Sequence, residues 1–171
     1  SLVHFGYKDG ALTYRQAACV EKIDQRDATH IDFTLKPGFM WTNGFGELTA
    51  EDVKYSYERM KVSEWKGFFD ALDKVEVHDK YSGTLVLKIP FAPFMVATLA
   101  SGTGTILSKK ATESVGGKYT TQIPATCGPY LYEWRQGQWV KFRLNPDWTG
   151  PKPAYDKIDA IFIQEDTAAA L

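Results

Sequence analysis

The sequence has little cysteine, little histidine and almost no net charge. Its 171 residues include two cysteines and three histidines, which are too scattered for the usual spacing of metal ligands. Twenty lysines and arginines stand against 21 aspartates and glutamates, for a formal net charge of -1. Binding to nucleic acid normally relies on a clear basic excess. We therefore expect no metal site, no cofactor and no nucleic-acid partner.

Long apolar runs are also missing. The longest candidates, residues 91–99 and 158–163, are far shorter than the roughly 18 residues that a membrane-spanning helix needs. No apolar leader opens the chain, so a targeting signal is expected to be absent from these residues. The sequence thus predicts no direct insertion into a membrane.

Apolar and aromatic residues are nevertheless plentiful. Hydrophobic residues make up 44% of the chain and aromatic residues 14%, which is enough to bury a core and too much for a disordered segment. One ordinary globular domain, or two very small ones, fits this length.

The first forty residues predict short strands between turn signals. The clearest is 30–35, where Ile31, Phe33 and Leu35 alternate with polar residues and share one face. The turn Lys36-Pro37-Gly38 ends it, because proline cannot donate a hydrogen bond to a sheet and glycine accepts the backbone angles of a tight turn.

A helix is predicted to begin after Thr49, which can cap the free amides of the first turn together with Asp52. Val53, Tyr57 and Met60 then form one apolar stripe. Further along, we expect strands over 75–78, 84–88, 130–134 and 138–144, and helices starting near Pro93 and Ser108. The pattern indicates an α+β fold with a mixed β-sheet and a few packed helices.

The two cysteines, Cys19 and Cys127, leave two interpretations open. They are either free, buried thiols, which we favour, or a disulfide that closes a long loop. Cys127 has no identifiable histidine partner, and no Gly-x-Ser-x-Gly motif is present. The segment Gly102-Thr103-Gly104 lacks the rest of a phosphate-binding loop. We therefore expect no catalytic residues, and a small thiol-dependent hydrolase is the alternative function.

Several motifs, taken together and in order, resemble one family. They start with Ile31-Asp32-Phe33-Thr34-Leu35-Lys36-Pro37-Gly38 and continue through Trp41, Asn43-Gly44, Leu48-Thr49-Ala50-Glu51-Asp52-Val53 and Tyr57-Glu58-Arg59. Later motifs are Ile106-Leu107-Ser108-Lys109-Lys110, Thr126-Cys127-Gly128-Pro129-Tyr130, Glu133-Trp134, Asn145-Pro146-Asp147-Trp148 and Lys157-Ile158-Asp159. The chain is similar in this way to the family 5 solute-binding proteins, the extracytoplasmic oligopeptide- and dipeptide-binding proteins of ABC importers. Cys19 and Cys127 depart from the family's usual residues, and an exported protein would oxidise them if they met.

The resemblance implies a periplasmic-binding-protein type II fold, of which this chain is expected to be most of the N-terminal lobe. Residues 1–40 and 120–171 are expected to form sheets, and 41–119 an inserted α/β subdomain. Family members are longer and close two lobes on a ligand, so this chain is expected to be a domain fragment.

The same resemblance implies a function without chemistry. The protein is expected to be a periplasmic monomer that captures a peptide or another small polar solute and delivers it to the permease subunits of an ABC importer. Main-chain pairing and water-filled pockets would hold the peptide in the cleft between lobes.

A binding cleft should carry aromatic and small polar groups on loops with free backbone amides. Three loops have this composition, namely 41–46, 100–105 and 125–128. Each has a plain structural alternative: an indole packed on the helix, a hinge-like turn and a bend, respectively. The candidate ligand-binding residues on these loops are Trp41, Asn43, Ser101, Gly102, Thr103, Cys127 and Gly128.

Overall fold

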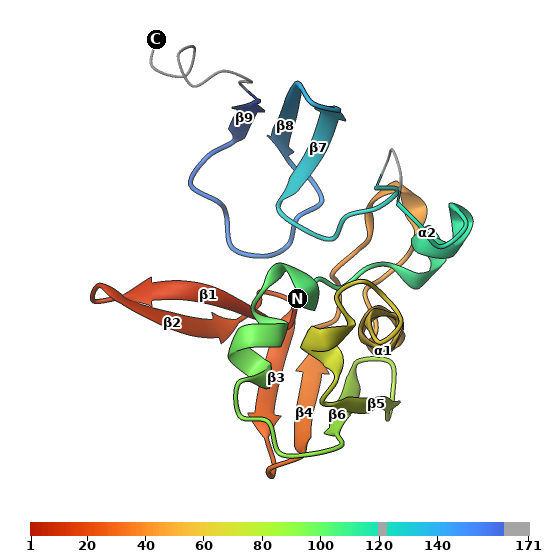
Figure 1. Ribbon diagram of the computed structural model, residues 1–171. Helices are drawn as coiled ribbons and strands as arrows, with labels where there is room; N and C mark the ends of the chain where they lie inside the picture. The colour runs from red at the N-terminus through yellow and green to blue at the C-terminus, as the bar shows by residue number, and fades with distance from the viewer. Residues whose placement is uncertain (120–122, 163–171) are drawn as a thin grey trace.

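The computed structural model describes residues 1–119 and 123–162, which form three antiparallel sheets and two α-helices (Figure 1). The elements are β1 (Val3–Lys8), β2 (Ala11–Gln16), β3 (Val20–Gln25), β4 (His30–Leu35), α1 (Ala50–Met60), β5 (Leu72–Val77), β6 (Ser82–Leu87), α2 (Lys109–Ser114), β7 (Tyr130–Arg135), β8 (Trp139–Leu144) and β9 (Lys157–Ile161). The predicted α+β class is confirmed, and every strand pair in these residues is antiparallel.

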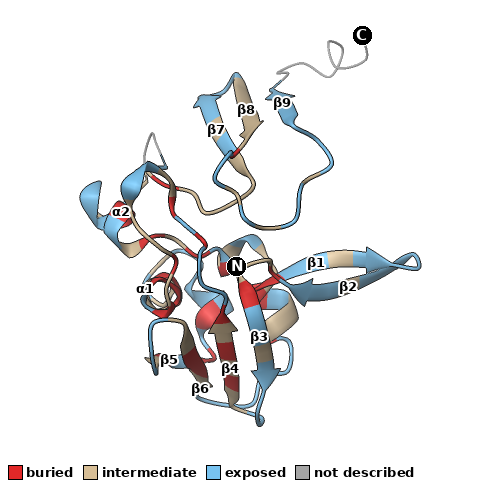
Figure 2. Ribbon diagram, turned by 180° about the vertical axis from the view of Figure 1, so that it is seen from behind, coloured by how far each residue is buried: buried red, intermediate tan, exposed pale blue. Residues whose placement is uncertain are grey.

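The core lies between α1 and a four-stranded sheet with the order β3-β4-β6-β5. The predicted strand at 30–35 is confirmed, and its alternation places Ile31, Phe33 and Leu35 on the buried face. Ile31 lies opposite Leu85 on β6, which lies opposite Val75 on β5. Figure 2 shows this buried face continuing from the sheet into α1. The opposite face carries the polar residues of the same strands, as a period of two requires.

Helix α1 begins as the sequence predicts. Thr49 is its N-cap and forms a capping box with Asp52, whose side chain accepts a hydrogen bond of 3.0 Å from the backbone nitrogen of Thr49. The apolar stripe also forms, since Val53 and Tyr57 have no exposed surface. The helix is therefore fixed by local capping and by burial of one face.

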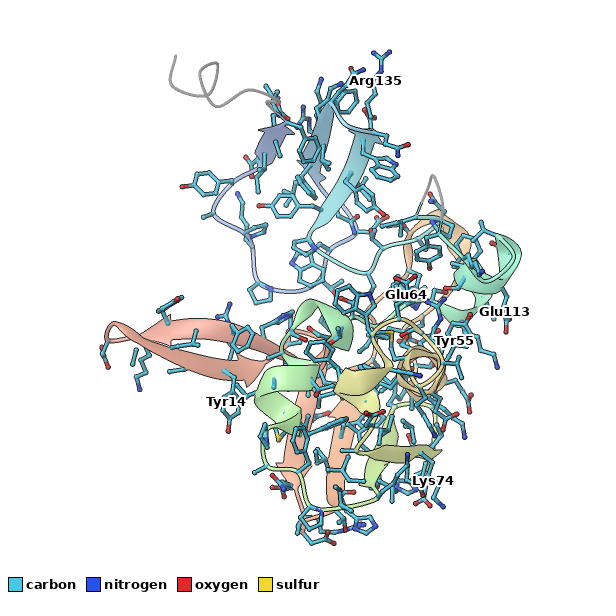
Figure 3. The ribbon with its side chains drawn as sticks, in the orientation of Figure 1. Tyr14, Tyr55, Glu64, Lys74, Glu113 and Arg135 are labelled. Carbon is cyan, nitrogen blue, oxygen red and sulfur yellow. The ribbon has the colours of Figure 1, made fainter. Side chains whose placement is uncertain are left out.

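Strands β1 and β2 form a two-stranded ribbon that projects from the core (Figure 1). Its register places Phe5 opposite Tyr14 and Tyr7 opposite Leu12 on one face, and all four side chains are exposed. Figure 3 labels Tyr14, which points away from the ribbon. A ribbon of two strands buries little by itself, so its stability depends on its attachment to the core.

The third sheet, β7-β8-β9, stands apart from the core in both views (Figures 1 and 2). It contains the predicted hairpin, in which Tyr130 pairs with Leu144 and Arg135 with Trp139. The register collects only apolar and aromatic side chains on one face: Tyr130, Tyr132, Trp134, Val140, Phe142, Leu144, Ile158 and Ala160. None of these residues is buried.

The connection between the core and this sheet is mostly irregular. The helix predicted after Pro93 is a short π-helix, Phe94–Leu99, and short 3-10 turns follow at Gly102–Gly104 and precede α1 at Thr42–Gly44. Helix α2 has its predicted cap, because Ser108 accepts a hydrogen bond of 3.2 Å from the backbone nitrogen of Ala111. These loops bring residues 41–46, 101–107 and 123–128 together.

Two further points concern the chain as a whole. Within the described ranges, 1–119 and 123–162, no helix is both long and apolar enough to cross a membrane. The division into 1–40, 41–119 and 120–171 stays a prediction; the pairing of β4 with β6 joins the first two ranges, and part of the third lies outside the described residues.

Candidate functional site

Three adjoining cavities lie where the irregular loops meet. The apolar cavity, of about 510 Å³, is lined by Met60, Trp65, Phe68, Ser101, Gly102, Thr103, Thr105 and Leu107. The central cavity, of about 270 Å³, is lined by Ser1, Cys19, Trp41, Leu48, Thr105, Ile106, Leu107, Ile123, Ala125, Thr126, Cys127, Gly128 and Tyr132. The polar cavity, of about 300 Å³, is lined by Thr42, Asn43, Ile123, Thr126, Leu131, Tyr132, Glu133 and Arg143.

Shared walls join these cavities in a row. Thr105 and Leu107 line both the apolar and the central cavity. Thr126 and Tyr132, with Ile123, line both the central and the polar cavity. The row thus runs from an apolar end to an end with charged side chains.

All seven candidate residues from the sequence line this row, but they are divided among the three cavities. Ser101, Gly102 and Thr103 line the apolar cavity. Trp41, Cys127 and Gly128 line the central cavity, and Asn43 lines the polar cavity. That these residues contact a ligand stays a prediction.

Trp41 is both packed on the helix and part of the cavity wall. It is only 6% exposed, and its indole nitrogen donates a hydrogen bond of 3.2 Å to Asp52 Oδ2. Its backbone nitrogen donates to the carbonyl of Gly46 at 2.7 Å. The indole is therefore held in one place, which suits a rigid wall.

Asn43 joins two of the loops. Its backbone is left-handed, with φ 59°, a conformation that asparagine tolerates better than most residues. Its side-chain nitrogen donates to the carbonyl of Pro124 at 2.8 Å. Next to it, the backbone nitrogen of Thr42 donates to the carbonyl of Thr126 at 2.9 Å. The polar end of the row is thus held together by hydrogen bonds between loops.

The hydroxyls beside the apolar cavity bond to each other and to the π-helix. Ser101 Oγ and Thr103 Oγ1 are 2.6 Å apart and lie 2.9 and 3.2 Å from the carbonyl oxygen of Thr98, so that one hydroxyl donates to the carbonyl and the other donates to the first hydroxyl. Gly104 is required in this turn, because a Cβ atom there would overlap the carbonyl of Leu99. These contacts shape the loop and leave Met60 and its aromatic neighbours as the main surface of the cavity.

Asp52 links Trp41, in the wall of the central cavity, to the start of α2. Its carboxylate accepts hydrogen bonds from the indole of Trp41 and, at 2.8 Å, from the backbone nitrogen of Lys109, besides those from the backbone and hydroxyl of Thr49. Four donors and a position in the first helical turn both suit a negative charge. Sequence reasoning identified Asp52 only as a helix cap.

Two further residues of α1 hold the segment that separates the apolar and central cavities. Ser56 Oγ accepts from the backbone nitrogen of Leu107 at 2.8 Å, and Tyr57 Oη donates to the carbonyl of Gly104 at 3.3 Å. Neither was predicted to have this role. A polar Ser56 beside the buried stripe, three residues after Val53, is the sequence signal that could have revealed it.

The two cysteines line the central cavity together. Both are free thiols, as favoured from the sequence, but they are half-buried. Burial raises the pKa of Cys127 to about 12 and also raises that of Cys19. A thiol that stays protonated is a poor nucleophile, so nothing in this cavity favours the thiol-dependent hydrolase.

Comparisons with known proteins place the chain in context. The family model of the bacterial extracellular solute-binding proteins, family 5 Middle, matches residues 18–171. The probable D,D-dipeptide-binding periplasmic protein DdpA of Escherichia coli K12 is 30% identical over 155 residues, which are 86% of this chain and 29% of DdpA. The chain therefore spans less than a third of the length of this relative.

Solved structures of binding proteins are also similar to this chain. The binding protein MoaA of A. tumefacien R10, in complex with mannopinic acid, has a TM-score of 0.81 and 28% identity over 98% of this chain and 35% of its own. The oligopeptide-binding protein AppA of Bacillus subtilis, in complex with a nonapeptide, has a TM-score of 0.79 and 25% identity over 92% of this chain and 33% of its own. The predicted periplasmic-binding-protein type II fold is confirmed for the part of these proteins that the chain spans.

Proposed function

Because the chain belongs to family 5 of the bacterial extracellular solute-binding proteins, we propose that it is one lobe of the substrate-binding component of an ABC-type peptide importer. The complete receptor captures its cargo outside the inner membrane and delivers it to the permease. The names of DdpA, a dipeptide-binding periplasmic protein, and AppA, an oligopeptide-binding protein, support both the class of cargo and the compartment.

One observation carries this proposal. The three loops selected for their composition, far apart in sequence, line a single row of cavities. A peptide needs apolar space for side chains and polar groups for its main chain, and the row offers the first at Trp65 and Phe68 and the second at Asn43 and Thr126.

The second lobe is part of the proposal. The chain covers 29% of DdpA and about a third of the matched structures, so most of each relative has no counterpart here. In the proposed receptor the second lobe closes over the row of cavities, and the peptide is held between the two surfaces.

A peptide ladder tests the proposal. The full-length receptor that contains this chain is titrated by calorimetry with alanine peptides of two to nine residues. At least one length should bind with a saturating heat, and lactose, an uncharged solute of similar size, should not. Binding of lactose with no peptide binding would contradict the proposal.

A pair of tryptophans supplies the matched control. Trp65 is 57% exposed and lines the apolar cavity, whereas Trp134 is 42% exposed and lines none of the three cavities. Trp65→Ala should weaken binding of the best peptide, and Trp134→Ala should leave it unchanged. Equal effects would show that the row of cavities is not the binding site.

A further inference from the structure

Two hydroxyl groups at the boundary between the central and the polar cavity are buried without a hydrogen-bond partner. They are Thr126 Oγ1 and Tyr132 Oη, and within residues 1–119 and 123–162 no other buried side-chain nitrogen or oxygen is left in this way. Both residues line both cavities. An unsatisfied buried hydroxyl costs free energy, so two of them in residues that line the same two cavities call for a functional reason.

The position of Thr126 is fixed from both sides. Its carbonyl accepts from the backbone nitrogen of Thr42 at 2.9 Å, and its own backbone nitrogen donates to Thr42 Oγ1 at 3.0 Å. The backbone is thus fully bonded, while the hydroxyl is not. The backbone of Thr126 is therefore held in place beside both cavities.

Tyr132 is fixed by its ring. It lies on β7 opposite Phe142, and the two ring centroids are 6.3 Å apart. Burial raises the pKa of Tyr132 to about 12, so its hydroxyl is neutral at physiological pH and can both donate and accept. By contrast, the hydroxyl of Tyr130, two residues earlier on the same face, donates to the carbonyl of Tyr155 at 2.6 Å.

The surroundings indicate the chemistry of the group that these hydroxyls would meet. Within the described residues, the side chains that line the central cavity are uncharged, while the amino group of Ser1 is buried near Cys19 and Cys127. The polar cavity, which both hydroxyls also line, carries the charged side chains Glu133 and Arg143, and Arg143 is already paired with Asp159. Each neutral hydroxyl can both donate and accept a hydrogen bond, as a peptide bond requires, whereas an ionised terminus needs an opposite charge.

The geometry points to Thr126 and Tyr132 as a binding subsite for an internal main-chain amide of the peptide. This inference rests on the proposed function and deepens it by assigning the part of the peptide that lies at the boundary of the two cavities. The amide would form hydrogen bonds with hydroxyls that have no partner in the free chain, so no existing hydrogen bond of these hydroxyls has to be broken when the peptide binds.

Stability of the chain without peptide is the first test. Tyr132→Phe and Thr126→Val should leave the urea midpoint of unfolding unchanged or slightly raised, because each removes an unsatisfied hydroxyl. Tyr130→Phe, the matched control, should lower the midpoint because it removes a formed hydrogen bond. A drop for Tyr132→Phe equal to that for Tyr130→Phe would show a partner within the protein or a structural water, and would overturn the inference.

Affinity of the full-length receptor is the second test, with the tightest-binding alanine peptide as the probe. Tyr132→Phe should weaken binding about fivefold or more, and Tyr130→Phe should leave it unchanged. The loss for Tyr132→Phe should be the same for the N-acetylated, C-amidated form of that peptide. An unchanged affinity, or a loss confined to the uncapped peptide, would contradict the subsite.

The two failures can be told apart. If the unaltered receptor binds no peptide, the proposed function fails, whatever the variants do. If it binds peptide and Tyr132→Phe binds equally well, the proposed function stands and the subsite fails.

Discussion

Two sheets of this molecule alternate apolar and polar side chains in the same way, but the apolar face of one is buried and that of the other is not. In the sheet β3-β4-β6-β5 the apolar face is covered by α1, and Phe33 and Leu85 are almost completely buried. In the sheet β7-β8-β9 the apolar face is just as continuous, yet none of its eight residues is buried. Alternation therefore determines which side chains share a face, but not whether the face is covered.

The polar contacts of the two regions differ in the same way. In the first turn of α1, the carboxylate of Asp52 is buried and accepts four hydrogen bonds. On β9, Asp159 forms an ion pair of 2.6 Å with Arg143 in which both side chains are substantially exposed. Figure 3 shows this outer position in another residue of the same sheet, Arg135, at the tip of the β7–β8 hairpin. Stability should thus be concentrated in the first region.

The largest expected difference concerns the aromatic residues of the two faces. Phe33→Ala should cost about 3–5 kcal/mol of unfolding free energy, because it leaves a cavity in a closed core. Phe142→Ala should cost about 1 kcal/mol, because its ring is only partly buried. Urea unfolding measures both, and equal losses would mean that the second sheet is covered as well as the first.

The acids should differ less, but in the same direction. Asp52→Asn should cost about 2 kcal/mol, since an amide cannot accept hydrogen bonds at both of its ends. Asp159→Asn should cost about 0.5 kcal/mol or less, as exposed ion pairs do. Urea unfolding measures both variants, and a larger loss of stability for Asp159→Asn than for Asp52→Asn would contradict the comparison.

Helix capping gives a smaller effect within the first region. Thr49→Ala should lower stability by about 1 kcal/mol, because the N-cap hydroxyl is lost while the Asp52 carboxylate remains. A thermal melt compared with the parent chain is sufficient. No change in the melting temperature would show that Asp52 alone completes the cap.

The smallest expected effect appears only in acid. Hydrogen bonds from Lys80, from the backbone of Gly38 and from Tyr81 lower the pKa of Glu47 to about 2, from an ordinary value of 4.5. This folded-state pKa is depressed, so the stabilisation is complete above pH 4.5 and is lost as the pH falls toward 2. Between pH 5.5 and 3, Glu47→Gln should lose less stability in urea unfolding than the parent chain. A loss equal to that of the parent would rule out this contribution.

Local patterns predicted much of this fold. The strand at 30–35, the capped helix after Thr49, the cap at Ser108 and the hairpin after Pro129 depend on residues close together in sequence, and all are confirmed. The helix expected after Pro93 is only a short π-helix. Which strands become neighbours depends on contacts over fifty residues, such as β4 with β6, and local patterns do not contain that information.

The sequence predicted which loops line the candidate site, but not the hydrogen bonds that hold these loops in place. Composition selected Trp41, Ser101 and Cys127, which line adjoining cavities. The roles of Asp52 and Thr126 depend on partners 57 and 84 residues away. Such long-range hydrogen bonds leave no periodic pattern in the sequence, so the residues that position the cavity walls could not be identified from the sequence alone.

The central claim is that a peptide is held between this lobe and a second one. Calorimetry with the best alanine peptide tests it most directly, by titrating the full-length receptor and the 171-residue chain side by side. We expect saturating binding to the receptor and no measurable heat from the chain alone at micromolar concentrations. Equally tight binding to the chain alone would place the whole site within one lobe and contradict the claim.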